Sequence, residues 1–374
     1  MDAPKPTGKY KVGTKVVTTI DEDRVEELGP NKGNTKRRIT YRIFYPVLPS
    51  DAQNLTNDEL LSREVTLGMS KEFKIKIDYD KITSQGKNKA EYYKDAPHAC
   101  GERFPLVIYN HGYKSYKEGN SFLCAELVSH GYVVISIGHP FEALAEVHTD
   151  GSADYFEKGL MKKSISPFLP GLIAEMKLTK SKGTPEELNQ KFYAMQNKYC
   201  TFMVHRVDEW VKDTLFVIEE AKSLYQDFIA FDRGIAATGH SMGGAVAYNL
   251  CHKSKDIKCG INIDGGLFGN YEGMVMNKPF FQICSENNYN VEMKPRLNKT
   301  VPVYYATFKK IKHVGFADIM FYIRISAVVG KIPADVAHNT LCKCHLDFFD
   351  KYLKNEDIEI NIPDNEFIKF EKFW

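Results

Sequence analysis

Six short apolar runs, rich in β-branched or aromatic residues, constrain the fold of this chain more than any other feature. They alternate little between polar and apolar positions, which is typical of strands buried on both faces of a parallel sheet. Segments with the apolar spacing of helices lie between several of them, as expected for strand–helix–strand crossovers. The runs are residues 105–110, 132–138, 234–239, 259–264, 279–286 and 301–308. This pattern predicts an α/β fold with a mostly parallel central sheet.

The segments around this pattern predict a hairpin and two insertions. Residues 11–20 and 38–45 are β-rich and joined by a Gly/Asn/Lys-rich loop, which predicts an N-terminal antiparallel hairpin. Residues 50–100 are polar and lysine-rich, so we expect an irregular, partly helical insertion. Residues 141–204 interrupt the strand rhythm, and connections this long tend to be lids or binding loops. Within this lid- or cap-like insertion, the apolar piece 164–176 is expected to cover a pocket, touch a lipid surface or form a plain buried loop.

Length and charge limit the class of protein. The 374 residues suffice for one α/β domain with these insertions, and we expect residues 1–374 to form it. With 50 basic and 48 acidic residues, the net charge of +2 indicates neither nucleic acid nor an anionic membrane as a partner. The start has no apolar signal-peptide core, and no stretch reaches the ~18–20 apolar residues of a transmembrane helix. A cytoplasmic protein is therefore expected, although a removed secretion signal would leave the same start. The oligomeric state stays open.

The eight cysteines indicate neither disulfides nor a metal centre. They are scattered, and several lie in apolar runs, which favours buried free thiols. The run Cys342-Lys343-Cys344-His345 has no second ligand pair at zinc-finger spacing, so we expect no metal site there. No organic cofactor is indicated either.

The segment Gly239-His240-Ser241-Met242-Gly243 matches the nucleophile-elbow pattern G-x-S-x-G. An apolar run precedes it and a small-residue, helix-compatible segment follows, as a sharp strand-to-helix turn requires. The glycines let neighbouring backbone pass without a Cβ clash, and the helix N-terminus stabilises developing negative charge. Ser241 is therefore the predicted nucleophile. The alternative is a tight turn with an unreactive serine.

A reactive serine needs a base, and the base needs an acid that holds it in one tautomer. In α/β-hydrolases these partners follow the serine in the order acid, then histidine. Asp264 and Glu286 each end a predicted strand, at the sheet edge where ligands bind, and Asp318 is a weaker third candidate. His313 follows the last strand-like run, which makes it the candidate base.

Two backbone N–H groups are needed to stabilise an oxyanion. Met242, the residue after the nucleophile, supplies the first in this hypothesis. His111-Gly112-Tyr113 follows an earlier strand-like run, so the Tyr113 N–H is the candidate second donor. The alternative is that His111-Gly112 only turns the chain.

These pieces resemble the secreted and intracellular type II platelet-activating-factor acetylhydrolases, whose relatives include bacterial esterases. The resemblance runs from about residue 100 to 330 through FPLVIYNHGY, GHSMGGAVA, CGINIDGGLFG, PFFQICSE and HVGFADIMFY. It implies an α/β-hydrolase fold and an acid on the strand directly after the nucleophile helix, which selects Asp264 and leaves Glu286 as the alternative acid. The resemblance also implies that His313 is the base and that Tyr113 and Met242 are the oxyanion donors. The chain departs from the family at residues 265–268 and in the insertion 141–200.

The predicted function is that of a serine hydrolase that cleaves carboxylic esters through a Ser-His-Asp triad and an acyl-enzyme. The resemblance implies short, acetyl-type acyl groups and a small-molecule, lipid-like ester substrate. The same triad also serves thioesterases, peptidases and acyltransferases. From another class, a non-catalytic α/β-hydrolase-fold binding protein is the remaining alternative.

Overall fold

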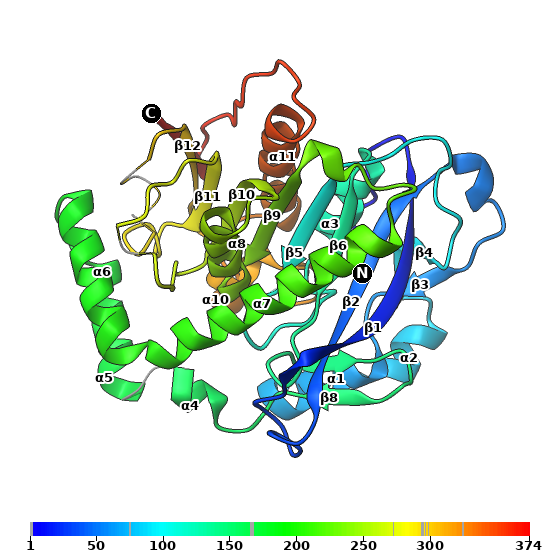
Figure 1. The fold of residues 1–374 in the computed structure, drawn as a ribbon, viewed down its shortest axis with the longest axis horizontal. Helices are drawn as coiled ribbons and strands as arrows, with labels where there is room; N and C mark the ends of the chain where they lie inside the picture. Colours follow the sequence, from blue (N-terminus) through cyan, green and yellow to red (C-terminus); the bar gives the residue numbers. More distant parts are fainter. Residues whose placement is uncertain are drawn as a thin grey trace. The chain divides into compact units, whose positions relative to one another are not determined.

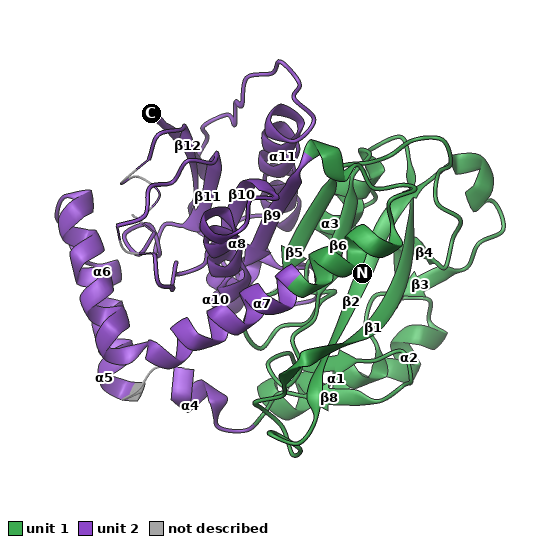
Figure 2. Ribbon diagram, viewed as in Figure 1, with its two compact units in different colours: residues 1–157, 216–233 green, residues 158–215, 234–374 purple. Residues whose placement is uncertain are grey.

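The computed structural model describes residues 3–74, 76–164, 168–271, 273–292, 295, 297, 299–323 and 325–374. The chain divides into two compact units (Figure 2). Unit 1 comprises Met1–Glu157 and Phe216–Arg233, and unit 2 comprises Lys158–Leu215 and Gly234–Trp374. Each unit is described by itself. The single domain expected from the sequence stays a prediction.

Unit 1 contains the N-terminal hairpin and the first two parallel strands (Figure 1). Its strands follow the order β5-β6-β2-β1-β4-β3, and a separate hairpin pairs β7 with β8. Its strands are β1 (Lys11–Val25), β2 (Lys36–Val47), β3 (Asn57–Glu59), β4 (Lys89–Lys94), β5 (Leu106–Asn110), β6 (Val133–Ile137), β7 (Ala145–Val147) and β8 (Ala153–Tyr155), and its helices are α1 (Arg63–Phe73), α2 (Tyr79–Ser84) and α3 (Ser121–Ser129).

The predicted hairpin is confirmed, and the first insertion adds strands. β1 and β2 pair antiparallel from Lys11 opposite Val47 to Asp21 opposite Arg37. Between residues 50 and 100, the structure has the expected helical pieces, α1 and α2, together with β3 and β4. β4 pairs in parallel with β1, and the buried residues of its sequence KAEYYK alternate with more exposed ones, as expected for a strand with one buried face.

Unit 2 contains the remaining strands of the parallel pattern. Its strand order is β13-β12-β11-β10-β9, in which β9 to β12 are parallel and β13 is antiparallel to β12. Its strands are β9 (Ile235–His240), β10 (Ile257–Ile263), β11 (Phe280–Ser285), β12 (Val303–Phe308) and β13 (Ile368–Phe373), and its helices are α4 (Leu160–Ser164), α5 (Phe168–Thr179), α6 (Pro185–Tyr199), α8 (Met242–Lys253), α9 (Ile319–Tyr322), α10 (Ser326–Val329) and α11 (Ala334–Tyr352). Helix α7 (Thr201–Leu224) begins in unit 2 and ends in unit 1.

Burial on both faces explains the parallel strands of unit 2. Every residue of β9, β11 and β12 is buried, and helix α8 packs on β9 and β10. Contiguous apolar runs gain from this arrangement because neither face has to meet water. All six predicted strands are present with ends shifted by one or two residues.

The second insertion contributes β7 and β8 to unit 1 and α4, α5 and α6 to unit 2. Residues 165–167 of the apolar piece 164–176 lie outside the described residues. Within the described part of the chain, no helix combines the length and the apolar character that crossing a bilayer requires. All eight cysteines are free thiols, and all except the exposed Cys100 are buried, as the sequence indicated.

Candidate active site

Ser241 lies at the junction between strand β9 and helix α8. Its backbone has φ 56° and ψ −120°, a conformation that residues with a side chain rarely adopt. The Ser241 N–H donates to the Ile263 carbonyl at 2.8 Å, which ties the junction to β10. Such backbone strain collects at functional sites, where the surrounding structure holds it in place. The predicted sharp strand-to-helix turn is therefore present, with the N-terminus of α8 directly after the serine.

The turn between β9 and α8 packs closely against the turn after β10, and this close approach requires two glycines. A Cβ on Gly265 would lie 2.1 Å from the Ser241 carbonyl oxygen, and a Cβ on Gly244 would lie 1.7 Å from Asn262 Oδ1. Neither distance is possible for real atoms, so any side chain at either position would push the junction and the β10 turn apart. The close approach of these two segments thus depends on Gly244 and Gly265.

The parallel register of β9 and β10 brings Asp264 to the same sheet edge as Ser241. Ile263 lies opposite His240, so Ser241 and Asp264 are the first residues beyond two neighbouring strands. Asp264 also has a positive φ of 55°. The Asn262 side chain holds this turn, because its Nδ2 donates to the Gly265 carbonyl at 2.8 Å and its Oδ1 accepts from the Gly265 N–H at 2.9 Å.

The Asp264 carboxylate is buried and accepts three hydrogen bonds. The Ser285 N–H donates to Oδ1 at 2.6 Å, while Asn288 Nδ2 and His313 Nδ1 donate to Oδ2 at 3.0 and 2.7 Å. Ser285 and Asn288 are the ends of one turn after β11, closed by the Asn288 N–H on the Ser285 carbonyl at 3.0 Å. This turn holds both oxygens of Asp264, which fixes the edge of the carboxylate that faces His313.

A second carboxyl group, that of Glu292, lies near Asp264. Glu292 is fully buried, and burial together with the negative charge of Asp264 raises its pKa well above the usual 4.5. Gln282 donates a hydrogen bond to it from its side-chain amide. Burial and the neighbouring Asp264 carboxylate therefore both favour the neutral form of Glu292.

His313 connects Asp264 with Ser241. It begins a 3-10 turn, His313–Phe316, after β12, and its Nε2 lies 2.9 Å from Ser241 Oγ. Burial opposes the charged ring, but the hydrogen bond and charge of Asp264 and the charge of Glu175 outweigh it, so the pKa of His313 is raised above 6.5. With Nδ1 donating to Asp264, the neutral ring presents Nε2 as an acceptor for the Ser241 proton.

His240, the residue before the serine, contacts the backbone and the ring of His313. Its Nε2 donates to the main-chain oxygen of His313 at 3.0 Å, and the two ring centroids are 4.7 Å apart. Burial, followed by the proximity of His313, lowers the pKa of His240 to about 3. His240 is therefore neutral at pH 7, and it positions His313 without competing with it as a base.

The other predicted site residues have different surroundings. Glu286, the alternative acid, is exposed, and its Oε1 accepts from the Lys310 N–H at 3.1 Å. Asp318 is buried as the N-cap residue of α9. Met242 is the first residue of α8, and Tyr113 belongs to unit 1, in the loop after β5. The geometry thus brings together Ser241, His313 and Asp264 and leaves Glu286 outside this group.

Sequence reasoning missed several residues that position this group. Asn262, Asn288 and His240 act through hydrogen bonds that depend on the turns around them. Asn residues directly after a strand are a turn signal, and the run Ser285-Glu286-Asn287-Asn288 carries it. Glu175 on α5 had no signal in the sequence. Burial raises its own pKa, and the charge of His313 acts in the opposite direction.

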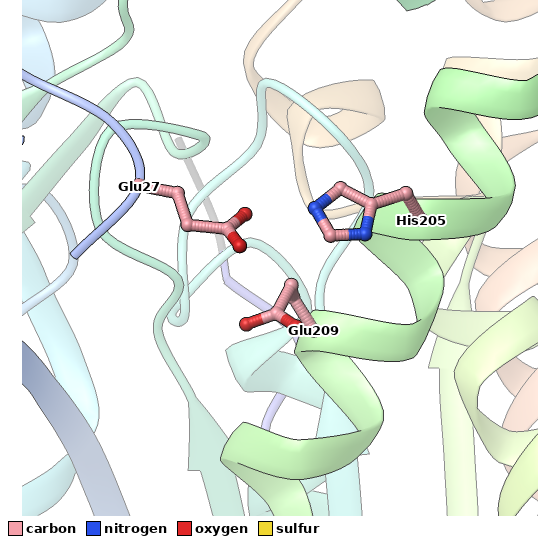
Figure 3. A group of neighbouring side chains, drawn as sticks. All are labelled: Glu27, His205 and Glu209. Atoms are coloured by element: carbon pink, nitrogen blue, oxygen red, sulfur yellow. The ribbon is translucent and has the colours of Figure 1, made fainter. Parts of the chain in front are cut away.

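Two clusters of titratable residues lie outside this group. On α7, His205 and Glu209 are four residues apart and extend from the same side of the helix, as Figure 3 shows. Glu209 accepts a hydrogen bond from Lys212 at 2.5 Å, and the third residue drawn, Glu27, belongs to the other unit. On α11, His345 donates from Nδ1 to the Leu341 carbonyl at 2.8 Å and accepts at Nε2 from a threonine hydroxyl.

A cavity of about 300 Å³ lies within unit 1, apart from the serine-bearing unit. Several charged side chains of its lining form ion pairs with one another or with buried neighbours. Arg42 Nε donates to Glu118 at 3.0 Å, and Lys117 Nζ donates to Glu146 at 2.8 Å. We interpret this cavity as the margin of a buried ion-pair network.

Comparisons with known proteins identify a family that this chain resembles. The sequence model of the family described as platelet-activating factor acetylhydrolase, isoform II, matches residues 1–157, nearer the N-terminus than the motifs suggested. The platelet-activating factor acetylhydrolase of Cavia porcellus is 25% identical over 377 residues, which cover 94% of this chain and 78% of that protein. That of Canis lupus familiaris is 26% identical over 379 residues, with 94% and 77% covered. The resemblance to this family is therefore confirmed.

The fold also has a counterpart among solved structures. A ferulic acid esterase from Streptomyces cinnamoneus superposes with a TM-score of 0.75 at 18% identity, covering 98% of each chain. At this identity the likeness concerns the fold alone. The predicted α/β-hydrolase fold with a mostly parallel central sheet is confirmed.

Proposed function

We propose that this chain is a serine carboxylic-ester hydrolase that cleaves short-acyl esters with Ser241, His313 and Asp264 as its triad. One observation carries the proposal: Ser241 Oγ, His313 and Asp264 form a continuous hydrogen-bonded chain with distances of 2.9 and 2.7 Å. The strained backbone of Ser241 and the similarity to acetylhydrolases and an esterase fold support the same assignment.

The reaction follows from the protonation states of the three side chains. Neutral His313 accepts the Ser241 proton at Nε2 while Ser241 Oγ attacks the ester carbonyl. The imidazolium that forms is stabilised by the buried Asp264 carboxylate and then donates its proton to the leaving alcohol. Water repeats the sequence on the acyl-enzyme, with His313 as base, and releases the carboxylic acid. His240 and Asn288 hold the orientation of the base and the acid during both halves.

The tetrahedral intermediate requires donors for its oxyanion. The Met242 N–H, at the first position of α8, is one donor in this proposal, and the partial positive charge at the N-terminus of that helix adds to it. The Tyr113 N–H is the proposed second donor, on the basis of the His-Gly-Tyr segment that follows β5.

The proposed substrate is a small, lipid-like ester with an acetyl-type acyl group. The support is the similarity to proteins named platelet-activating factor acetylhydrolase, a name that describes removal of an acetyl group from a lipid. Residues 265–268 and the insertion at 141–200 depart from the sequence pattern of that family. They are expected to set the preferred acyl length and alcohol.

Labelling with a fluorophosphonate probe tests the nucleophile. The native chain is expected to label at Ser241, and Ser241→Ala is expected to lose labelling and at least about 10³-fold in kcat while keeping its melting temperature. A folded chain that does not label would overturn the enzyme proposal and favour a non-catalytic binding protein.

A substrate panel tests the reaction class. p-Nitrophenyl esters of increasing acyl length are compared with a thioester and an aminoacyl amide, each with water or an added alcohol as acceptor. The proposal expects the highest kcat/KM for the acetyl ester with water. Preference for the thioester, the amide or transfer to the alcohol would instead indicate a thioesterase, a peptidase or an acyltransferase.

A further inference from the structure

Helix α5 exposes an apolar face on the outside of unit 2. Leu169, Ile173 and Met176 are 65%, 45% and 58% exposed, and their spacing of four and three residues places them on one side of the helix. Leu178 is buried on the other side, where Glu175 acts electrostatically on His313. A surface helix normally turns its apolar side inward, so an outward row of three large apolar residues needs a partner.

The charge around this face is strongly positive. Residues 158–183 contain six lysines and one glutamate, a net formal charge of +5, whereas the whole chain has a net charge of +2. The lysines are exposed, and in the sequence they precede and follow the apolar row: Lys158, Lys162, Lys163, Lys177, Lys180 and Lys182. The next exposed carboxylates after residues 158–183 are Glu186 and Glu187, in the first turn of α6. The near-neutral balance of the whole chain conceals this local excess.

We propose that the outer face of α5, with the lysines that flank it, docks unit 2 onto an anionic lipid surface. Leu169, Ile173 and Met176 would enter the boundary between head groups and acyl chains, as apolar residues of interfacial helices do. The flanking lysines would keep their ammonium groups at the level of the phosphates, because their long aliphatic stems can lie along the apolar layer. Met161 on helix α4, which contacts α5, is also exposed.

Charge and shape favour lipid over a protein partner as the occupant. A row of three apolar side chains with lysines before and after it in the sequence matches a planar, negatively charged surface. Binding to such a surface does not require a specific pocket. Docking through α5 would hold the proposed esterase site of the same unit beside a lipid layer. The docking does not depend on the proposed function, and the two are tested separately.

Vesicle cosedimentation of the full chain tests the proposal. The chain is expected to bind phosphatidylcholine vesicles that contain phosphatidylglycerol more tightly than vesicles of phosphatidylcholine alone, and added salt is expected to weaken this binding. The triple variant Leu169→Ser, Ile173→Ser, Met176→Ser is expected to bind the anionic vesicles at least about 30-fold more weakly, because three apolar side chains no longer enter the layer. Lys177→Gln with Lys180→Gln is expected to weaken binding about 25-fold, at about fivefold per lysine.

A matched control separates this face from general apolar exposure. Ile20, Val25 and Leu224 are 49%, 46% and 52% exposed in unit 1, and their combined replacement by serine is expected to leave vesicle binding unchanged. The α5 variant is expected to hydrolyse a water-soluble acetyl ester at the native rate, because its three replaced side chains are exposed on the side of α5 opposite to Glu175 and Leu178. Native-like vesicle binding by the α5 variant, or no vesicle binding by the native chain, would overturn the docking proposal without touching the esterase proposal. Loss of self-association in the α5 variant by gel filtration, without any vesicle binding, would identify a second copy as the occupant instead.

Discussion

Replacement of Asp264 by asparagine is expected to disable the proposed triad while preserving its shape. The Ser285 N–H donates to Asp264 Oδ1, so the new amide must place its oxygen there and its NH₂ group at the position of Oδ2. That NH₂ group would face two donors, Asn288 Nδ2 and His313 Nδ1. His313 can relieve this conflict by moving its proton to Nε2, but the ring then cannot accept the proton of Ser241.

The magnitude follows from the charge that is lost. Two unit charges at the 2.7 Å separation of His313 Nδ1 and Asp264 Oδ2 attract by about 6 kcal/mol at an effective dielectric constant of about 20. The His313 side chain is 42% exposed, so solvent screening reduces the stabilisation of the imidazolium to about 4 kcal/mol. At about 1.4 kcal/mol per factor of ten, this corresponds to about 10³-fold in kcat, and the wrong tautomer increases the loss toward about 10⁴-fold.

Steady-state hydrolysis of p-nitrophenyl acetate over a range of pH measures this loss. The matched control is Glu286→Gln, since Glu286 is exposed and contacts the Lys310 N–H, and its kcat is expected to stay within about threefold of the native value. A larger loss in Glu286→Gln than in Asp264→Asn would refute the reasoning and move the acid one strand further along the sheet. Equal melting temperatures for both variants would show that the comparison concerns catalysis.

Three further predictions concern the surroundings of the triad. The native kcat/KM should fall as the pH drops through the His313 pKa, which lies above 6.5, because the protonated ring cannot act as a base. In a pH–rate profile, Glu175→Gln should move this acid limb, the fall in kcat/KM at low pH, to lower pH, since Glu175 raises the His313 pKa. Asn288→Ala should lower kcat about tenfold with an unchanged KM, and it should move the acid limb to higher pH because Asp264 Oδ2 loses a competing donor; a profile identical to the native one would mean that Asn288 is only structural. Gly265→Ala should lower both the melting temperature and the activity, because its Cβ would lie 2.1 Å from the Ser241 carbonyl, and an unchanged melting temperature would contradict the close approach.

The strands of this fold could be predicted because burial on both faces leaves a contiguous apolar run. PFFQICSE and VPVYYATF could be located within two residues for this reason. β4 and β13 were missed because they are short strands with mixed polarity, stabilised by pairing with β1 and β12 rather than by their own pattern. Their existence depends on which neighbour the chain brings alongside, which local periodicity does not encode.

The same distinction applies to the candidate site. Ser241, Asp264 and His313 each follow a strand, so a parallel sheet collects them at one edge whatever the details of the loops. The choice between Asp264 and Glu286 needs the direction of the chain after each strand. A positive φ and the Asn262 side chain turn Asp264 back toward β11, whereas Glu286 continues outward into solvent. Neither effect has a signature in a single sequence beyond the glycine that follows Asp264.

The sequence pattern of helix α5 does not show which of its sides is exposed, whereas the structure does. Its sequence FLPGLIAEMKLT has apolar residues on all sides, so periodicity cannot tell a buried helix from one that turns an apolar face to the outside. The fold decides the matter, because Glu175 and Leu178 occupy the inward side and leave Leu169, Ile173 and Met176 exposed. If α5 only closed over the site, those three positions would tolerate serine without consequence for any binding. The lysine excess around them is the reason to expect instead that the same substitutions abolish docking on anionic lipid while soluble-ester hydrolysis persists.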